Sequence, residues 1–286
     1  MNNAIRKTAY YREFMDFGYL WMLRSGHNVP VTYRPLDRNI SLWNQLTAQL
    51  PPQFFNCCPM HMLGEILQRP PRAKRQVPFV LTVSLNPGLA QNIQAQENRA
   101  GLNNNFGNNG ADYADGCSNY FQIIYGDGGL NIVGNGFWRK LSRMTYRAMN
   151  GVNIVNGQIL DWMSASVVHT DLWPLRVGNF GDFIAHENGF PPGFARPTRN
   201  AMLIDFIQAA DADVTLLLGN EIDLGFGIGN LQALPLLGNL QAPTVERPVF
   251  RVPNLPRCYR TIHPSAIGVR NAEFDNIGER IFIDLN

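Results

Sequence analysis

Four short runs of apolar and β-branched residues, each ending abruptly in polar or turn residues, constrain the fold of this chain most strongly. The runs and the residues that end them are Phe79–Leu85 before Asn86-Pro87-Gly88, Ser164–His169 before Thr170-Asp171, Val214–Leu218 before Gly219-Asn220, and Cys258–Ile262 before His263-Pro264. Helical patterns lie between them, notably at Gly136–Met149 and Asn200–Ala210. Parallel strands need crossover connections, and these are usually helices. The alternation therefore predicts an α/β sandwich with a parallel sheet, whose ligands bind beyond the carboxyl ends of the strands.

The amino-terminal region has a different pattern. Apolar residues at helical spacing predict one helix over Tyr10–Leu23, and Ser41–Leu50 is consistent with a second that Pro51-Pro52 stops. We expect residues 1–75 to pack as helices on an α/β core of residues 76–286, so that residues 1–286 form a single domain.

Composition narrows the classes of function. The 286 residues are 45% hydrophobic and 16% charged with a formal net charge of +2, so any contact with nucleic acid must come from a local basic patch. Neither a membrane-spanning stretch nor the apolar region of a signal peptide is present, and we expect a cytoplasmic protein without a membrane partner. The four cysteines are too few for a disulfide framework and lack metal-binding spacing, so we predict no metal and no cofactor; they are Cys57, Cys58, Cys117 and Cys258.

Two strand-end motifs carry the most specific signal: Ser84-Leu85-Asn86-Pro87-Gly88-Leu89 and His263-Pro264-Ser265. In this order they resemble the two active-site motifs of the uracil-DNA glycosylase superfamily. The first is closest to the GxNPG form of its mismatch-specific and single-strand-selective monofunctional branches. Gly136-Phe137-Trp138 resembles the family's GxFW helix start, and Val168–Leu175 resembles its base-recognition strand end.

The resemblance implies a three-layer α/β/α sandwich with a central, mainly parallel four-stranded sheet. It also implies a monofunctional DNA glycosylase, which hydrolyses the N-glycosidic bond of a flipped pyrimidine and leaves an abasic site. That reaction passes through an oxocarbenium-like sugar and releases an anionic base, so the site must position water and stabilise negative charge. By the resemblance, Asn86 holds the water, His263 donates to the base carbonyl, and Leu85 and Gly88 line the base site.

Other contacts to DNA follow from the same resemblance. The partner is single-stranded DNA or a duplex with a flipped base, and no obligatory protein partner is implied. Phe106 is the candidate for stacking on the base, with Tyr113 or Tyr120 as substitutes, although a core position for Phe106 is equally consistent with the sequence. After His263, the candidates for a wedge into the DNA stack are Ile267, Val269 and Arg270, and Ser265 is expected to hold a phosphate.

Asp171 departs from the family, since it aligns with an asparagine of uracil-cutting relatives. An ionised aspartate can only accept hydrogen bonds, which favours the N4 amino group of a cytosine-type base over uracil. Alternatively, Thr170 occupies the asparagine position and Asp171 is a structural cap.

Because excising cytosine itself would destroy a genome, this reading predicts a modified cytosine, such as the glucosylated hydroxymethylcytosine of some phages, as an antiphage glycosylase would cut. The alternatives are a repair glycosylase for uracil or oxidised pyrimidines, and a non-catalytic DNA-binding protein with the same fold.

Overall fold

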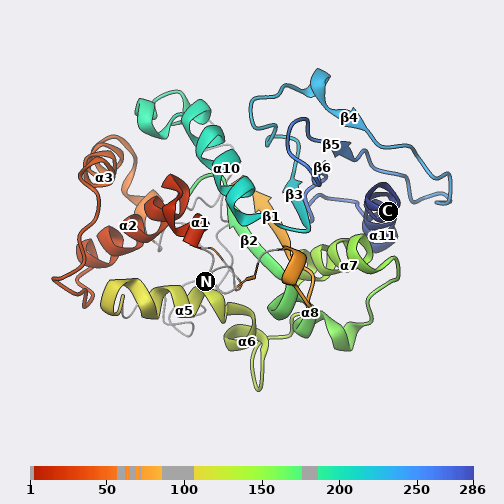
Figure 1. The fold of residues 1–286 in the computed structure, drawn as a ribbon, viewed down its shortest axis with the longest axis horizontal. Coiled ribbons are helices and arrows are strands. Elements are labelled where there is room, and N and C mark those ends of the chain that lie inside the picture. The colour runs from red at the N-terminus through yellow and green to blue at the C-terminus, as the bar shows by residue number, and fades with distance from the viewer. Residues whose placement is uncertain are drawn as a thin grey trace.

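A mostly parallel β-sheet forms the centre of the molecule (Figure 1). The computed structural model describes residues 3–56, 62, 64, 69–70, 72–85, 106–175 and 186–286. Within these residues the sheet has six strands in the order β2-β1-β3-β6-β5-β4. Their bounds are Val80–Ser84 (β1), Val167–Asp171 (β2), Val214–Leu218 (β3), Gln232–Ala233 (β4), Phe250–Arg251 (β5) and Cys258–Thr261 (β6).

The prediction of a mixed α/β fold with a mainly parallel sheet is confirmed, and the number of strands is corrected from four to six. The four predicted strands run parallel, in the order β2-β1-β3-β6. The two additional strands, β5 and β4, continue the sheet as antiparallel pairs beside β6. Each has only two residues, too few to give a periodic pattern in the sequence.

Burial on both faces explains why the parallel strands read as continuous apolar runs. Every residue of β1, β2, β3 and β6 is buried. The predicted strand at Ser164–His169 was displaced, because Ser164 and Ser166 belong to the end of helix α8 (Ile159–Ser166). The strand starts at Val167 and includes Asp171 as its last residue.

The four helices predicted from the sequence are present, and their ends match to within a few residues. Asn135 caps α7 by accepting hydrogen bonds from the backbone N–H groups of Phe137 and Trp138, which fixes the first turn of that helix. This helix, α7, spans Gly136–Asn150. The bounds of the other helices are Asn3–Lys7 (α1), Ala9–Arg24 (α2), Asp37–Gln49 (α3), Ala111–Ser118 (α5), Tyr120–Tyr125 (α6), Arg196–Ala210 (α10) and Asn271–Leu285 (α11).

The amino-terminal helices share one continuous hydrophobic core with the sheet. Helix α2 packs against α10, where the ring centroids of Tyr10 and Phe206 are 4.7 Å apart, and against α3, where those of Phe17 and Trp43 are 5.2 Å apart. In Figure 1, α2 lies to the left of β1, β2 and β3, α10 lies above and to the left of them, and α7 and α11 lie to their right. Among the described helices, none is long and apolar enough to cross a bilayer.

The strand order predicts a ligand-binding edge at the carboxyl end of β1. The connection from β1 leads to β2 on one side, whereas β3 lies on the other side of β1 and is followed along the sheet by β6. Ligands of open parallel sheets bind where the strand order reverses in this way. The residues that end β1, β2 and β6 are therefore the first to consider as a site.

Candidate active site

The ends of β1 and β2 are joined beyond the last paired residues of the sheet. Ser84 lies opposite Asp171 in the parallel register. The backbone N–H of Leu172 then donates to Ser84 O at 2.8 Å, and that of Trp173 donates to Leu85 O at 2.9 Å. These bonds fix the start of the first motif against the segment Val168–Leu175, for which the resemblance implies base recognition. Asn86 and Gly88, which follow directly, lie outside the described residues.

His263 approaches the same edge from β6. Its Nε2 atom lies 3.4 Å from Ser84 Oγ, and its Nδ1 atom accepts the backbone N–H of Ser265 at 3.1 Å. Because Nδ1 is an acceptor, the proton of the neutral imidazole resides on Nε2. At the end of β3, Gly219 has a φ of +109°, which few other residues adopt, and a Cβ there would lie 3.8 Å from His263 Cβ.

Burial keeps this imidazole neutral. Desolvation lowers the pKa of His263 to about 4. At neutral pH His263 therefore presents one uncharged N–H donor at the carboxyl ends of β1 and β6. A donor of this kind matches the role that the resemblance implies for the residue.

The first turn of α7 packs against the two histidines of the site. The Phe137 ring centroid lies 5.4 Å from that of His263 and 5.3 Å from that of His169, and Trp138 lies 5.2 Å from His169. The sequence indicated Gly136-Phe137-Trp138 as a helix start, but it gave no sign that these rings contact the histidines. Aromatic rings thus form one side of the edge where His263 presents its donor.

His169 and Asp171 lie two residues apart on β2 and so face the same side of the sheet. The Thr82 hydroxyl donates to Val168 O at 3.3 Å, which leaves its oxygen to accept from His169 Nδ1 at 2.9 Å. His169 Nε2 then turns an acceptor toward Asp171 Oδ1, 4.0 Å away. Burial, and next repulsion from His263 when that residue is protonated at acidic pH, lower the pKa of His169 to about 3, so this residue is also neutral at neutral pH.

The structure corrects one premise about Asp171. The predicted preference for a cytosine-type base requires an ionised carboxyl, but burial raises the pKa of Asp171 well above the ordinary value, which favours the protonated form. Within the described part of the chain, Oδ1 makes no hydrogen bond. The pKa of Asp171 is raised because the residue is only 3% exposed and its neighbour His169 carries no charge to compensate a carboxylate. A neutral carboxyl offers one donor and one acceptor instead of acceptors alone.

Thr170 faces the opposite side of β2 from Asp171. It is fully buried, and its Oγ1 lies 3.0 Å from the hydroxyl of Tyr10 on α2. Its side chain is thus directed toward the amino-terminal helices and away from His169. This placement favours Asp171 over Thr170 as the residue that reads a base.

Phe106 is not placed for stacking on a base. It is fully buried, with its ring centroid 5.3 Å from Tyr19, 4.8 Å from Tyr33 and 5.8 Å from Tyr113. Tyr113 and Tyr120, the suggested substitutes, are also buried. The core position that the sequence left open for Phe106 is the one it occupies, because the aromatic side chains of α2 and α5 enclose it.

The turn that follows His263 separates the candidate DNA contacts into two groups. Ile267 is 100% exposed, and Ser265 and Arg270 are exposed beside it. Val269 is only 6% exposed and belongs to the core, so it is removed from the candidates for a wedge. Ile267 and Arg270 remain, on a turn that Gly268 closes with a φ of +76°.

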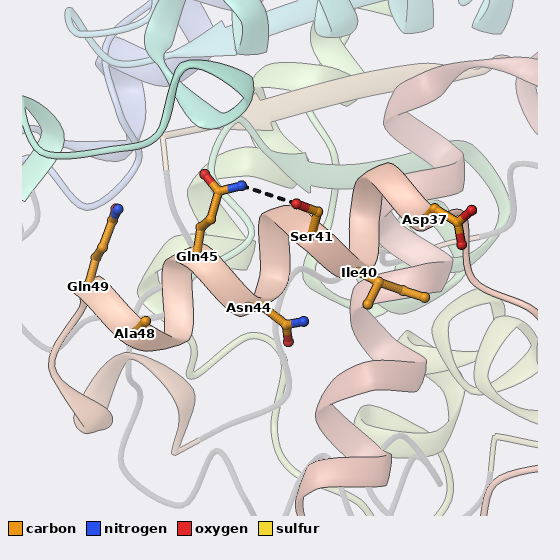
Figure 2. A pocket seen from close by; sticks show the side chains of 7 residues that line it. All are labelled: Asp37, Ile40, Ser41, Asn44, Gln45, Ala48 and Gln49. Carbon is orange, nitrogen blue, oxygen red and sulfur yellow. Dashed lines mark hydrogen bonds between the residues drawn. The ribbon is translucent and has the colours of Figure 1, made fainter.

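A hollow beside α3 lies elsewhere and does not contribute to this site (Figure 2). The described residues that line it all belong to that one helix, and most of them are polar; they are Asp37, Ile40, Ser41, Asn44, Gln45, Ala48 and Gln49. None of them is a buried titratable group. Among the described residues, no group of three or more histidine, cysteine or acidic side chains is placed to bind a metal ion.

Comparison with protein-family models, with curated proteins and with solved structures gives no match.

Proposed function

We propose that this chain is a monofunctional DNA glycosylase that hydrolyses the N-glycosidic bond of a pyrimidine flipped out of DNA, within the three-layer α/β/α arrangement that the motifs imply. One observation carries the proposal. The His263 imidazole is neutral, has its proton on Nε2, and lies 3.4 Å from Ser84, two residues before Asn86. The two motifs are remote in sequence, and their residues meet at one strand edge.

The chemistry assigned to His263 follows from its protonation. When the glycosidic bond breaks, its electron pair goes to the base, and negative charge builds on the adjacent carbonyl oxygen. A fixed N–H donor in a site walled by Phe137 stabilises that charge more than water does, because it needs no reorganisation. Asn86 holds the water that attacks the sugar carbon from the other side, and the base leaves as the anion.

Asp171 is the residue that reads the base in this proposal. In its neutral form it accepts from N3–H and donates to O4 of uracil, or accepts from the N4 amino group and donates to N3 of cytosine. In its ionised form it keeps only the acceptors and so favours a cytosine-type base. The preference for cytosine-type bases thus belongs to the ionised state, and burial favours the neutral state.

The proposed substrate is a modified cytosine, such as the glucosylated hydroxymethylcytosine of phage DNA. A uracil glycosylase is the second candidate, and the neutral Asp171 is the specific observation that supports it, because that form pairs with uracil as well as with cytosine. Both candidates use the same Asn86 and His263. The exposed turn with Ile267 and Arg270 contacts the DNA in either case, with the apolar residue entering the stack and the cation near a phosphate.

Base release from defined DNA tests the proposal. Purified protein is incubated with DNA containing uracil, cytosine, hydroxymethylcytosine or glucosylated hydroxymethylcytosine, and free bases are identified by mass spectrometry. We expect release of a modified cytosine, whereas release of uracil alone would return the protein to ordinary repair. DNA binding without release of any base would contradict the glycosylase function and favour the non-catalytic alternative.

A further inference from the structure

Three buried polar residues outside the strand edge hold the base-recognition segment from behind. Tyr10 and Glu13 lie one turn apart on α2, and Arg199 lies in the first turn of α10. Their exposed fractions are 0%, 1% and 0%. Glutamate and arginine are rarely so completely buried, and the chemistry described above uses none of the three residues.

Their hydrogen bonds converge on the backbone where β2 ends. The Tyr10 hydroxyl donates to Asp171 O and lies 3.0 Å from Thr170 Oγ1. Arg199 donates from Nε and Nη2 to Leu172 O at 2.9 and 2.6 Å, and from Nη1 to Glu13 Oε1. Carbonyl groups that are buried at a strand end need partners, and these side chains supply them.

The residue types in this group indicate that it orients the backbone carbonyls at the end of β2 more than it stabilises the fold. The guanidinium lies between aromatic rings, 5.4 Å from the centroid of Tyr10 and 5.3 Å from that of Phe194, and is paired with Glu13. Apolar residues of similar volume commonly stabilise a core as well as such a buried ion pair does. A planar guanidinium fork, by contrast, fixes both the distance and the direction of the carbonyl that it binds.

We infer that Tyr10, Glu13 and Arg199 are positioning residues for base recognition: through the backbone of residues 170–172 they set where the Asp171 carboxyl lies relative to Ser84 and His263. This inference rests on the proposed glycosylase function. It makes α2, which the sequence suggested only as packing, part of the apparatus that reads the base. Reacting groups displaced by about 1 Å typically lose about 100-fold in rate, so a small shift of residue 171 is sufficient to matter.

Tyr10→Phe is the sharpest test, because it removes one oxygen and keeps the ring. Tyr33→Phe is the matched control: its hydroxyl is also buried in the amino-terminal region and donates to Asp16 Oδ1 at 2.7 Å, away from β2. Base release is measured in single turnovers at increasing protein concentration, so that the maximal rate and the half-saturating concentration are separated. Thermal unfolding of both variants is measured alongside.

We expect both variants to lose similar stability, and only Tyr10→Phe to lose about 10- to 100-fold in maximal rate. Arg199→Lys, which keeps the charge but not the fork, should act like Tyr10→Phe. Equal rates for the Tyr10→Phe and Tyr33→Phe variants would overturn the inference.

Hydrogen exchange of the segment 168–175 separates this failure from failure of the proposed function. We expect faster exchange in Tyr10→Phe than in Tyr33→Phe. Unchanged exchange would show that the Tyr10 hydroxyl does not hold the backbone of residues 170–172, and would refute the inference. Faster exchange in a protein whose wild type releases no base would refute the glycosylase function, and with it the role in base recognition.

Discussion

Replacing His263 by alanine removes the one neutral N–H donor that we assign to the leaving base. With a pKa of about 4, roughly one imidazole in a thousand is charged at pH 7, so the neutral donor accounts for the activity there. Loss of a single preorganised donor to a developing anion costs about 100- to 1000-fold in rate, or about 2.7–4 kcal/mol of barrier. We expect His263→Ala to lower the single-turnover rate of base release by that factor.

Folding should survive the same change. His263 is half-buried and contacts Phe137, so its loss should cost about 1 kcal/mol and shift Tm by about 2–4 °C. His27→Ala is a matched control, because His27 is also half-buried against an aromatic ring, that of Trp21, with centroids 5.6 Å apart. It should lose similar stability and keep its rate.

The assay is base release from a DNA in which the wild type is active, followed by rapid quench over a range of pH. Burial has moved the pKa of His263 to about 4, so the rate–pH profile of the wild type should show no transition near pH 6.5 that is due to this histidine. A rate within about threefold of the wild type, or a loss of rate matched by His27→Ala, would refute the reasoning.

Three further predictions concern Asp171 and the exposed turn. Uracil excision by the wild type should fall as pH rises through the raised pKa of Asp171, because ionisation removes the O–H donor, and Asp171→Asn should abolish that dependence in a rate–pH profile. The folded state favours protonated Asp171, so the contribution of this residue to the free energy of unfolding is complete below the ordinary carboxyl pKa. Between that pKa and the raised one it declines by up to about 1.4 kcal/mol per pH unit. In mildly alkaline buffer, denaturant unfolding should therefore show Asp171→Asn to be more stable than the wild type, and equal stability would contradict the raised pKa. Arg270→Ala should weaken DNA binding and reduce the salt dependence of the binding constant by about one phosphate contact, and unchanged salt dependence would remove Arg270 from the interface. Ile267→Ala should slow excision from duplex more than from single-stranded DNA, and equal effects on both substrates would remove Ile267 from the interface.

Much of the fold could be predicted from the sequence, because burial on both faces leaves a simple pattern. The strand Val214–Leu218 and the helix starting at Gly136 were predicted at their observed bounds or starts. The start of β2 was not predicted, because the pattern of Ser164–Ser166 and its apolar neighbours is consistent with a helix and with a strand alike. The strands β4 and β5 are defined by their pairing, β5 with β6 and β4 with β5, and not by their own residues.

The site was predictable where its residues occupy motifs and unpredictable where they act through packing. His263 and Asp171 were placed at the strand ends from the motifs alone, and the structure brings both to one edge of the sheet. The burial that neutralises Asp171 and the enclosure of Phe106 depend on neighbours that the local sequence does not specify. Arg199 contacts Glu13 across 186 positions, and no local pattern marks such a pair.

The most direct test of the central claim is the intact mass of a synthetic DNA strand with one modified cytosine, measured before and after incubation with the protein. We predict one unbroken strand that has lost the base and gained water, and no change with a variant that lacks both Asn86 and His263. A strand of unchanged mass for every base offered, or a strand cut at the base without an abasic product, would contradict the account.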